Sequence, residues 1–539
     1  MSVSVEVRPR FRRSVRIDAD YATTTAIDGF HCPRSFASAL TFMAQHVSET
    51  GQGAFTWTGP YGGGKSSLAL AFACLAGAKK AVRDQAIDIF GEPTVSALKS
   101  ALPYFPARWD VLPIITEKRS LTEQLAEALD IQIGKSSLSQ AVLKELQSRT
   151  AERGLVLIID ELGRGLEAAA SGEGDIHILQ DIAELASRSD GRFLFIGILH
   201  QSFEEYAERL GREARDSWAK IQGRFVDISI TVSLDETIDL IAEAIGSMRA
   251  PQALKALADE CARELRPSRT DAEAKRLATS LARCAPLHPL AACLIGPLSR
   301  RRFGQNQRSV FSFLASSEQH GLQDALAESK SGELYPVSRL WDYVRANLES
   351  AVLASPDSRR WAVAADAIER CAARGGSEHE LRVLKTIGMI ELLKDRSGLI
   401  SARSTLKLAL PDINDKAIDG ALRSLERASE IVFRKHANAY VLYSGSDFDV
   451  DGKVDEALSA LGQPDVSLIQ SLADLQPLLA KRHHRETGAM RWFNIAIEAV
   501  SDLASAKAIT SKADIIGQII LAIPTQGETP KKAEKLISE

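Results

Sequence analysis

Short apolar, β-branched or aromatic runs alternate with amphipathic segments through the first 235 residues. The runs begin near residues 54, 109, 155, 193 and 225, and the segments between them place apolar side chains at helical spacing, as Phe36, Leu40, Met43 and Val47 do. Such alternation is typical of parallel sheets, because a right-handed crossover returns the chain to the same edge. The pattern therefore predicts an α/β fold, with an αβα domain over about residues 20–235 whose strands all end at one edge.

After Asp235 the pattern becomes helical, and we divide the chain into residues 1–235, 236–330, 331–450 and 451–539. In the third region we expect helices at 381–393, 404–410 and 415–428, followed by alternating runs at 430–435 and 439–443. Three helices and then a hairpin is the order of a winged helix. In the last region we expect helices at about 454–461 and 467–480, a strand at 515–523 and a helix from residue 531.

One stretch carries a complete phosphate-loop motif. Residues 59–66 read Gly-Pro-Tyr-Gly-Gly-Gly-Lys-Ser and satisfy G-x-x-x-x-G-K-[ST], with a predicted strand before them and a predicted helix after them. Glycines let successive backbone N–H groups point at one anion beside a helix N-terminus. The alternative is a glycine-rich turn capped by a serine. The expected nucleotide-binding residues are Gly59, Pro60, Tyr61, Gly62, Gly63, Gly64, Lys65, Ser66 and Ser67, with Lys65 on the phosphates of ATP and Ser66 on Mg²⁺.

A second motif ends the buried run at 154–159, where two carboxylates, Asp160 and Glu161, follow five consecutive apolar residues. A run of this kind is typical of a strand buried on both faces, and it places the acids at the carboxyl edge of the sheet. Asp160 can orient Mg²⁺, and Glu161 can accept a proton from the attacking water. The alternative is a strand that ends in an acidic turn.

Composition excludes several other classes of protein. The net charge of −4 provides no general attraction for nucleic acid, and the 45% hydrophobic and 25% charged residues are typical of soluble globular proteins. The six cysteines form no Cys-x-x-Cys pair, which argues against a disulfide framework and a zinc site. No signal peptide or membrane-spanning run is present, so we expect a cytoplasmic protein without a membrane partner. The arginines among residues 1–20 leave two readings open, an edge strand and a basic arm.

The phosphate loop and the Asp160–Glu161 pair together resemble the Walker motifs of AAA+ ATPases, in the additional-strand, catalytic-glutamate class. The order of ATPase core, helical lid and winged helix is similar to the origin-recognition and STAND branches, including large ATPases of bacterial phage-defence loci. The resemblance implies a sensor residue after the strand at 193–199, which is His200 or Gln201 here. It also implies a trans-acting arginine finger, Arg224 or else Arg215, and a sensor arginine from the lid at Arg308.

The resemblance implies a nucleotide-driven switch with ATP and Mg²⁺ as cofactors. A homo-oligomer, DNA and a separate protein effector all stay open as partners. The expected third helix of the winged region mixes Lys416, Arg423 and Arg427 with acidic residues, whereas the turn at 434–436 is basic. Two functions therefore compete: an ATPase that works on nucleic acid, and a slowly hydrolysing platform that recruits an effector.

Overall fold

The structure is a computed structural model, and the described residues are 5–12, 15–131, 137–207, 212–246, 251–265, 270–300, 310–328, 333–443, 457, 460, 465–505, 515–524 and 530–538. The chain divides into two compact units, Met1–Ser444 and Gly445–Glu539. The predicted boundaries at 235 and 330 fall inside the first unit and stay predictions.

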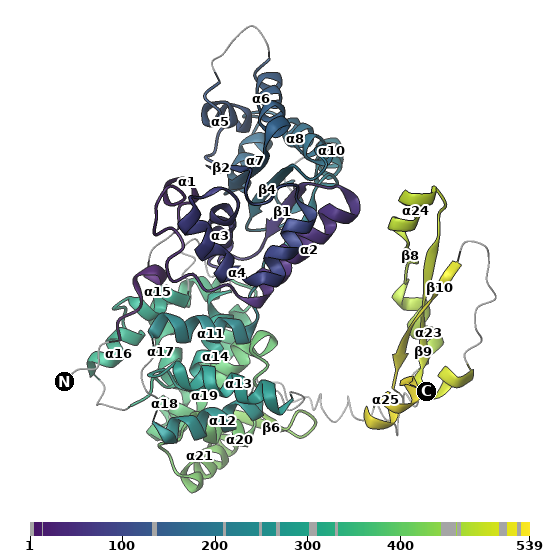
Figure 1. Ribbon diagram of the computed structural model, residues 1–539. Helices are drawn as coiled ribbons and strands as arrows, with labels where there is room; N and C mark the ends of the chain where they lie inside the picture. The colour runs from purple at the N-terminus through teal and green to yellow at the C-terminus, as the bar shows by residue number, and fades with distance from the viewer. Residues whose placement is uncertain are drawn as a thin grey trace. The chain divides into compact units, whose positions relative to one another are not determined.

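A five-stranded parallel sheet forms the centre of residues 54–229 in the first unit (Figure 1). Its order is β2-β3-β4-β1-β5, so that β4 lies between the strand before the phosphate loop and the strand that carries the carboxylates. The pairing sets Trp109 beside Gly154, Leu155 beside Phe193, and Phe55 beside Val226. The strands are β1 (Ala54–Thr58), β2 (Trp109–Ile115), β3 (Gly154–Asp160), β4 (Phe193–Leu199) and β5 (Val226–Ser229).

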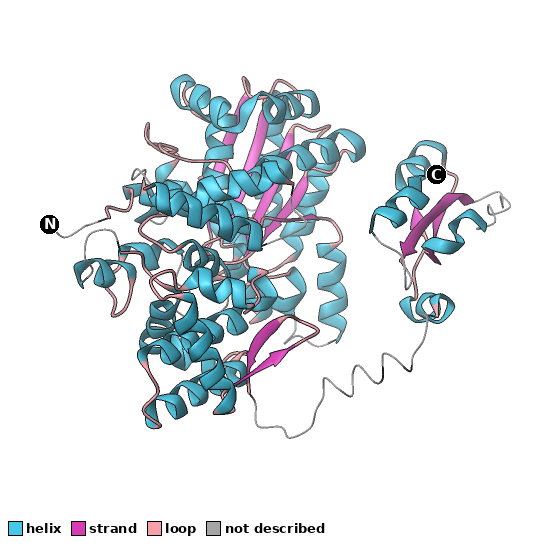
Figure 2. Ribbon diagram, turned by 90° about the horizontal axis from the view of Figure 1, so that it is seen from below, coloured by secondary structure: helices cyan, strands magenta, loops and turns pink. Residues whose placement is uncertain are grey.

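Helices cover both faces of this sheet (Figure 2). Alternate residues of β3 face opposite layers: Val156 and Ile158 pack with α2, α3 and α4, whereas Leu155 and Leu157 pack with α5 to α8. This is the predicted αβα core, and the α/β fold class is confirmed. The helices are α1 (Ile17–Asp20), α2 (Arg34–Thr50), α3 (Lys65–Gly77), α4 (Lys80–Ala101), α5 (Leu121–Ala128), α6 (Leu138–Glu152), α7 (Leu162–Ala170), α8 (His177–Ser187), α9 (Phe203–Ala207) and α10 (Arg212–Gln222).

The described residues between 234 and 328 are mainly helical, as the sequence predicts. Capping boxes begin two of these helices: Ser233 with Glu236 starts α11, and Thr270 with Glu273 starts α13. His288 accepts a hydrogen bond from the Leu290 amide at the start of α14 and contacts the Leu408 carbonyl through Nε2. The helices are α11 (Leu234–Ile245), α12 (Gln252–Leu265), α13 (Asp271–Arg283), α14 (Pro289–Ser299), α15 (Val310–Ala315) and α16 (Leu322–Glu328).

Residues 337–442 add five helices and an antiparallel hairpin in the predicted order of helices and then strands. Their buried side chains belong to the same hydrophobic core as those of α11 to α16. The two regions therefore share one core. The elements are α17 (Val337–Leu353), α18 (Ser358–Ala373), α19 (Glu378–Ser397), α20 (Arg403–Ala409), α21 (Asp415–Arg427), β6 (Ile431–Arg434) and β7 (Ala439–Leu442).

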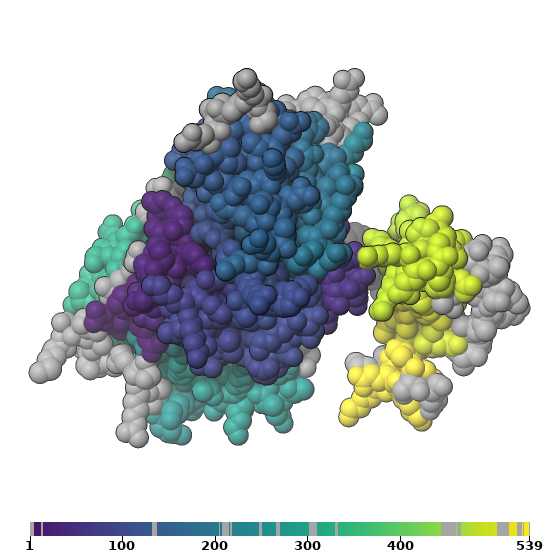
Figure 3. Space-filling view, turned by 45° about the horizontal axis from the view of Figure 1, so that its top comes forward, coloured from purple at the N-terminus to yellow at the C-terminus, as the bar shows by residue number. Residues whose placement is uncertain are grey.

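In its described residues, 5–12 and 15–20, the N-terminal segment is neither an edge strand nor a free basic arm. Val5 and Val7 are buried in the core of the helical region, and the Arg8 amide donates to the Ala244 carbonyl. A single 3-10 turn, η1 (Pro9–Arg12), follows, and the chain then enters the sheet domain at Ile17. Figure 3 shows the start of the chain, in purple, beside both the blue sheet domain and the teal helical region. It therefore joins the helical region to the sheet domain.

The second unit contains a three-stranded sheet in the order β10-β9-β8, in which β9 pairs parallel with β10 and antiparallel with β8. The strand at 515–523 is as predicted, whereas β9 was not predicted. The helix expected at 467–480 ends at Ala473 and is followed by a strand. The elements are α23 (Val466–Ala473), β8 (Leu478–Leu479), α24 (Lys481–Thr487), β9 (Trp492–Ala499), η2 (Val500–Ser505), β10 (Ile515–Ile523) and α25 (Pro530–Ser538).

Among the described residues, no helix has the length and apolarity that crossing a bilayer requires.

One buried ion-pair network connects α18, α19 and the hairpin. The Arg374 guanidinium donates to both carboxylate oxygens of Glu430, each at 2.9 Å, and to Glu380 Oε1 at 2.7 Å. Glu430 is only 2% exposed and Glu380 is also buried. Burial alone would raise the pKa of Glu380, but hydrogen bonds from Ser424, Arg374 and Ser377 lower it to about 2.

We expect Arg374→Ala to destabilise the first unit by about 3–5 kcal/mol, because it leaves two buried carboxylates without their cation. Arg370→Ala is the control: it removes an exposed pair with Asp366 from the same helix and should cost about 0.5 kcal/mol. Urea unfolding at pH 7 measures both. The lowered pKa of Glu380 stabilises the fold above about pH 4.5, and this contribution disappears toward pH 2, so the deficit should shrink there. Equal deficits for the two variants would contradict the network.

Candidate functional site

The phosphate loop connects β1 to the buried helix α3, which begins at Lys65. Gly64 has φ +83°, a left-handed conformation that glycine adopts without strain, and a Cβ there would meet the Phe36 ring at 3.0 Å. At Gly59 a Cβ would lie 2.3 Å from the Ile230 carbonyl oxygen. The loop consequently packs against α2 and against the residue that follows β5, and the N-terminus of α3 points its N–H groups at the bend.

A cavity of about 430 Å³ opens at this bend. Three parts of the chain surround it: the phosphate loop, the helical region and the N-terminal segment. Of the predicted nucleotide-binding residues, Pro60 to Ser67 line it, and Glu161 and His200 lie on its wall. Gly59 is not among its lining residues but supplies a carbonyl that Lys65 contacts. The other lining residues include Arg10, Phe11, Phe30, Phe36, Thr237, Leu240, Arg300, Val310 and Phe311.

Asp160 and Glu161 end β3 beside the loop. Asp160 is buried, hydrogen-bonds to the Ser66 hydroxyl, and accepts from the Glu161 amide at 2.9 Å. Glu161 has φ +55°, unusual for a residue with a side chain, and such strain is common at functional sites. This backbone turns the Glu161 carboxylate toward His200, whereas Asp160 stays with Ser66.

The two carboxylates have pKa values that shift in opposite directions. Burial raises the pKa of Asp160, although the Ser66 hydroxyl and the Glu161 amide oppose this shift. The hydrogen bond to His200 lowers the pKa of Glu161, and the positive charges of Arg164 and Lys65 add to this effect against burial. Divergent pKa values in a pair of neighbouring acids suit two different roles. Glu161 is therefore ionised at neutral pH, as an acceptor of a proton from water must be.

His200 connects the phosphate loop to Glu161. Its Nδ1 lies 3.2 Å from Lys65 Nζ, and its Nε2 lies 3.0 Å from Glu161 Oε1. The Tyr61 ring stacks on the imidazole at 3.3 Å between centroids and 13° between planes. Gln201, which the sequence could not distinguish from its neighbour, is not among the residues that line the cavity.

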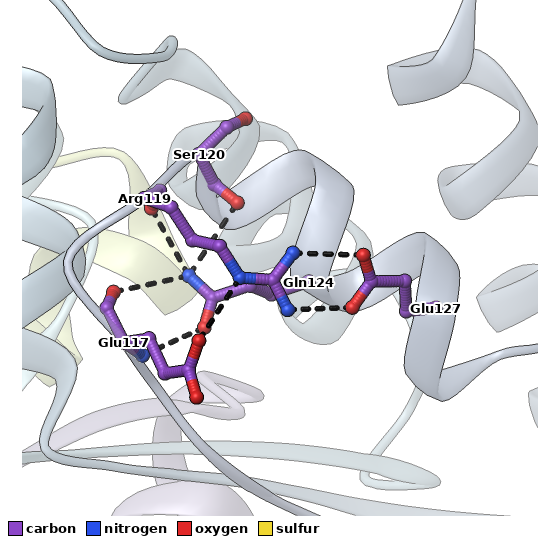
Figure 4. Close-up of polar contacts among 5 residues, drawn as sticks. All are labelled: Glu117, Arg119, Ser120, Gln124 and Glu127. Carbon is purple, nitrogen blue, oxygen red and sulfur yellow. Dashed lines mark hydrogen bonds and ion pairs between the residues drawn. The ribbon is translucent and has the colours of Figure 1, made fainter.

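The loop after β2 hydrogen-bonds to the backbone of the two acidic residues. The Thr116 hydroxyl donates to the Asp160 and Glu161 carbonyls. Gln124 holds the loop that follows: its amide nitrogen donates to the Glu117, Arg119 and Ser120 carbonyls, and its oxygen accepts from the Glu117 amide (Figure 4). Arg119 in turn pairs with both oxygens of Glu127. This network keeps the strand end at 116 in place beside the Asp160–Glu161 peptide.

The arginine candidates lie in different places. Arg224 precedes β5 and therefore lies at the amino ends of the parallel strands, whereas the cavity lies at their carboxyl ends. Its guanidinium pairs with Glu184 at 3.3 Å, and its carbonyl accepts from Gln52. It cannot reach the site of its own chain. Arg215 is exposed on α10, and Arg308 lies outside the described residues.

Sequence reasoning missed Arg300, which does line the cavity. Its guanidinium donates to the Val232 and Ser233 carbonyls and to the Thr237 hydroxyl, the last at 2.7 Å. It is the first residue of an Arg-Arg-Arg run, which was a visible signal, although spacing alone favoured none of the arginines.

The N-terminal segment also supplies residues that the sequence did not indicate. The Arg10 guanidinium lies 4.6 Å from the centroid of the Phe30 ring and donates to the Ile27 and Asp28 carbonyls, and burial lowers its pKa to about 10. Phe11 packs on Phe311 with 4.6 Å between ring centroids. Aromatic and apolar side chains therefore line the wall of the cavity away from the loop, as a nucleobase requires.

The donor set fits Mg²⁺. The Ser66 hydroxyl and the Asp160 carboxylate are hard oxygen ligands that already lie together. The described residues contain no group of three or more His, Cys, Asp and Glu side chains suited to a metal. A serine–aspartate pair suits an ion that takes few protein ligands and completes its shell with phosphates and water.

No protein-family model matches the chain, and no curated protein matches it. The ORC2 protein of Aeropyrum pernix, solved as ADPNP–ADP complexes, aligns over 81% of this chain and 98% of its own at 11% identity and a TM-score of 0.30. The Drosophila ORC bound to DNA aligns over 82% of this chain and 98% of its own at 12% identity and a TM-score of 0.28. Because both scores are below 0.5, the assignment of the site rests on its own geometry.

We expect Lys65→Ala to abolish binding of Mg-ATP, because Lys65 is the cation that the loop directs at the phosphates. A ligand at a hundred times its dissociation constant stabilises a protein by about 2.7 kcal/mol, so Mg-ATP should raise the melting temperature of the wild type but not of the variant. The exposed Lys99 on α4 provides the control, and Lys99→Ala should shift as the wild type does. A full shift in Lys65→Ala would contradict the phosphate-binding assignment.

Proposed function

We propose that this chain is an AAA+-like ATPase that binds and hydrolyses Mg-ATP and acts as a nucleotide-driven switch. One observation carries the proposal: a phosphate-loop lysine, a serine and an ionised glutamate all line one cavity of nucleotide size, and the serine hydroxyl bonds to the buried Asp160, with which it can hold Mg²⁺. A phosphate loop alone would support binding. The addition of a base at the same cavity supports hydrolysis.

Each group has a separate task in this reaction. The N–H groups at the start of α3 and the Lys65 ammonium bind the β- and γ-phosphates, and Ser66 and Asp160 hold Mg²⁺, which neutralises phosphate charge when bound. Glu161 accepts the proton of the attacking water. The aromatic wall that includes Phe11 and Phe311 excludes water and receives the base.

The helical region is the element through which the nucleotide would act. Thr237, Leu240 and Arg300 of this region face the same cavity as the phosphate loop. A nucleotide bound there contacts both regions and favours the arrangement in which both can reach it. We propose that the oligomer and its partner respond to this change, as the resemblance implies, and that the chain serves in phage defence on the same ground.

DNA is one candidate partner of this switch. In the region proposed as a winged helix, Lys416, Arg423, Arg427 and Lys435 are exposed. However, Arg403 pairs with Asp419, and Lys407 pairs with Asp415. A cation that is paired with an acid contributes less to DNA binding than an unpaired cation does, because the acid repels the phosphates of the DNA backbone.

A slow regulatory ATPase that recruits a protein effector is the second candidate. Its support comes from the second unit, which holds nine of the fifteen large hydrophobic side chains exposed among the described residues. Exposed apolar groups of this kind are typical of protein-binding surfaces. They are Leu468, Leu472, Leu478, Leu479, Met490, Ile519, Ile520, Leu521 and Ile537.

Glu161→Gln should bind Mg-ATP and fail to hydrolyse it, because the amide keeps the shape of the side chain and loses the basic oxygen. Phosphate release in single-turnover conditions measures hydrolysis, and a thermal shift with Mg-ATP verifies binding. The neighbouring acid Glu167 supplies a control, and Glu167→Gln should behave as the wild type. If Glu161→Gln releases phosphate near the wild-type rate, the general base is another residue.

Arg224 should act on the site of a neighbouring copy, since it lies at the far edge of its own sheet. Arginine fingers contribute about a thousandfold or more to phosphoryl transfer. Arg224→Ala and Glu161→Gln should each be inactive alone, and mixing them should restore activity at sites that combine both intact residues. Light scattering verifies mixed oligomers. If such oligomers recover no activity, or if Arg224→Ala alone is fully active, Arg224 is only a surface residue that pairs with Glu184. Arg215 is then the next candidate to test.

A further inference from the structure

The imidazole of His200 contacts both the phosphate-loop lysine and the proposed general base. Lys65 Nζ lies 3.2 Å from Nδ1 and Glu161 Oε1 lies 3.0 Å from Nε2. The His200 side chain is 10% exposed, and the Tyr61 ring stacks on one of its faces. A hydrogen bond from its own backbone amide to Tyr206 holds the chain at this residue. The ring therefore has a defined plane and two defined partners.

The chemistry of the partners identifies the tautomer. A lysine ammonium has three donors and no acceptor, so Nδ1 must accept and can carry no hydrogen. With Nδ1 as an acceptor, the ring carries its hydrogen on Nε2, which donates to the Glu161 carboxylate. The contact with Lys65 on one side thus selects the ring form that can hold Glu161 on the other side.

We propose that His200 is a positioning residue that connects phosphate binding at Lys65 to the orientation of Glu161. This inference rests on the proposed ATPase function and adds the link between its two halves. Lys65 contacts the Gly59 and Pro60 carbonyls and His200 Nδ1, so its three donors already have three acceptors. To bind phosphate oxygens, the ammonium must leave at least one of them. His200 consequently competes with the phosphate oxygens for the Lys65 ammonium, and it orients the Glu161 carboxylate.

Two substitutions separate these roles because each keeps one end of the ring. In His200→Gln the longer amide can place a donor where Nε2 lies, and it leaves the Nδ1 position empty. In His200→Asn the shorter amide can place an acceptor where Nδ1 lies, and it does not reach Glu161. Gln201→Ala is the matched control, because the adjacent side chain does not line the cavity.

We expect His200→Asn to lose about a hundredfold in kcat with little change in KM, since a misplaced catalytic group costs about this much. We expect His200→Gln to stay within about tenfold of the wild type and to bind Mg-ATP at least as tightly, because the competitor for Lys65 is gone. Gln201→Ala should match the wild type in both quantities. Melting temperatures without nucleotide verify that all variants are folded.

The double variant Glu161→Gln with His200→Asn tests the link independently. If His200 acts only through Glu161, the double variant should hydrolyse ATP no more slowly than Glu161→Gln alone. A further loss would show that His200 acts on the substrate itself, and wild-type kcat in His200→Asn, or equal losses in the Gln and Asn variants, would also overturn the inference. Failure of the wild type to bind or hydrolyse ATP would instead refute the proposed function, which is a distinguishable result.

Discussion

The buried charge of Lys65 is the constraint on which the rest of this site depends. The residue is 4% exposed and begins a helix whose N-terminus is itself positive. A cation in such a place costs several kcal/mol of desolvation unless acceptors surround it. The Gly59 and Pro60 carbonyls and the His200 ring supply them. An anion that approaches the loop would satisfy the lysine and the helix N-terminus together, which supports phosphate as the proposed ligand of this bend.

The parallel sheet brings further polar groups to this local charge. Because β1, β3 and β4 are adjacent and parallel, the phosphate loop, Glu161 and His200 all follow strand ends at one edge. The three groups are distant in sequence and need no further element to bring them together. Only the left-handed turn at Glu161 and the support of its carbonyl by Thr116 are needed to aim the carboxylate.

The sequence predicted the features that depend on local pattern. The strands at 54–58, 109–115 and 193–199, the phosphate loop and the acidic pair follow from short apolar runs and glycine spacing, and the sheet confirms the strands. The contribution of Arg300 could not be predicted, because several arginines share that stretch and only packing against Val232 and Thr237 selects one. The N-terminal segment was unpredictable for a similar reason: its valines are buried only by helices more than 200 residues away. In the second unit, β9 mixes apolar and polar residues without a clear period.

The shared core of the helical regions limits how a change at the cavity can reach the rest of the first unit. The carbonyl of Arg300, whose side chain faces the cavity, accepts from Arg396 at the end of α19, and His288 at the start of α14 contacts the Leu408 carbonyl of α20. Close-packed cores shift between discrete arrangements and do not deform continuously. We therefore expect α14, α19 and α20 to move together if Arg300 is displaced. The N-terminal segment opposes that movement, because Val5 and Val7 belong to the helical core while Ile17 belongs to the sheet domain. The turn η1 lies between these two anchors, and its residues Arg10 and Phe11 line the cavity, so a ligand there contacts the segment that connects the two parts.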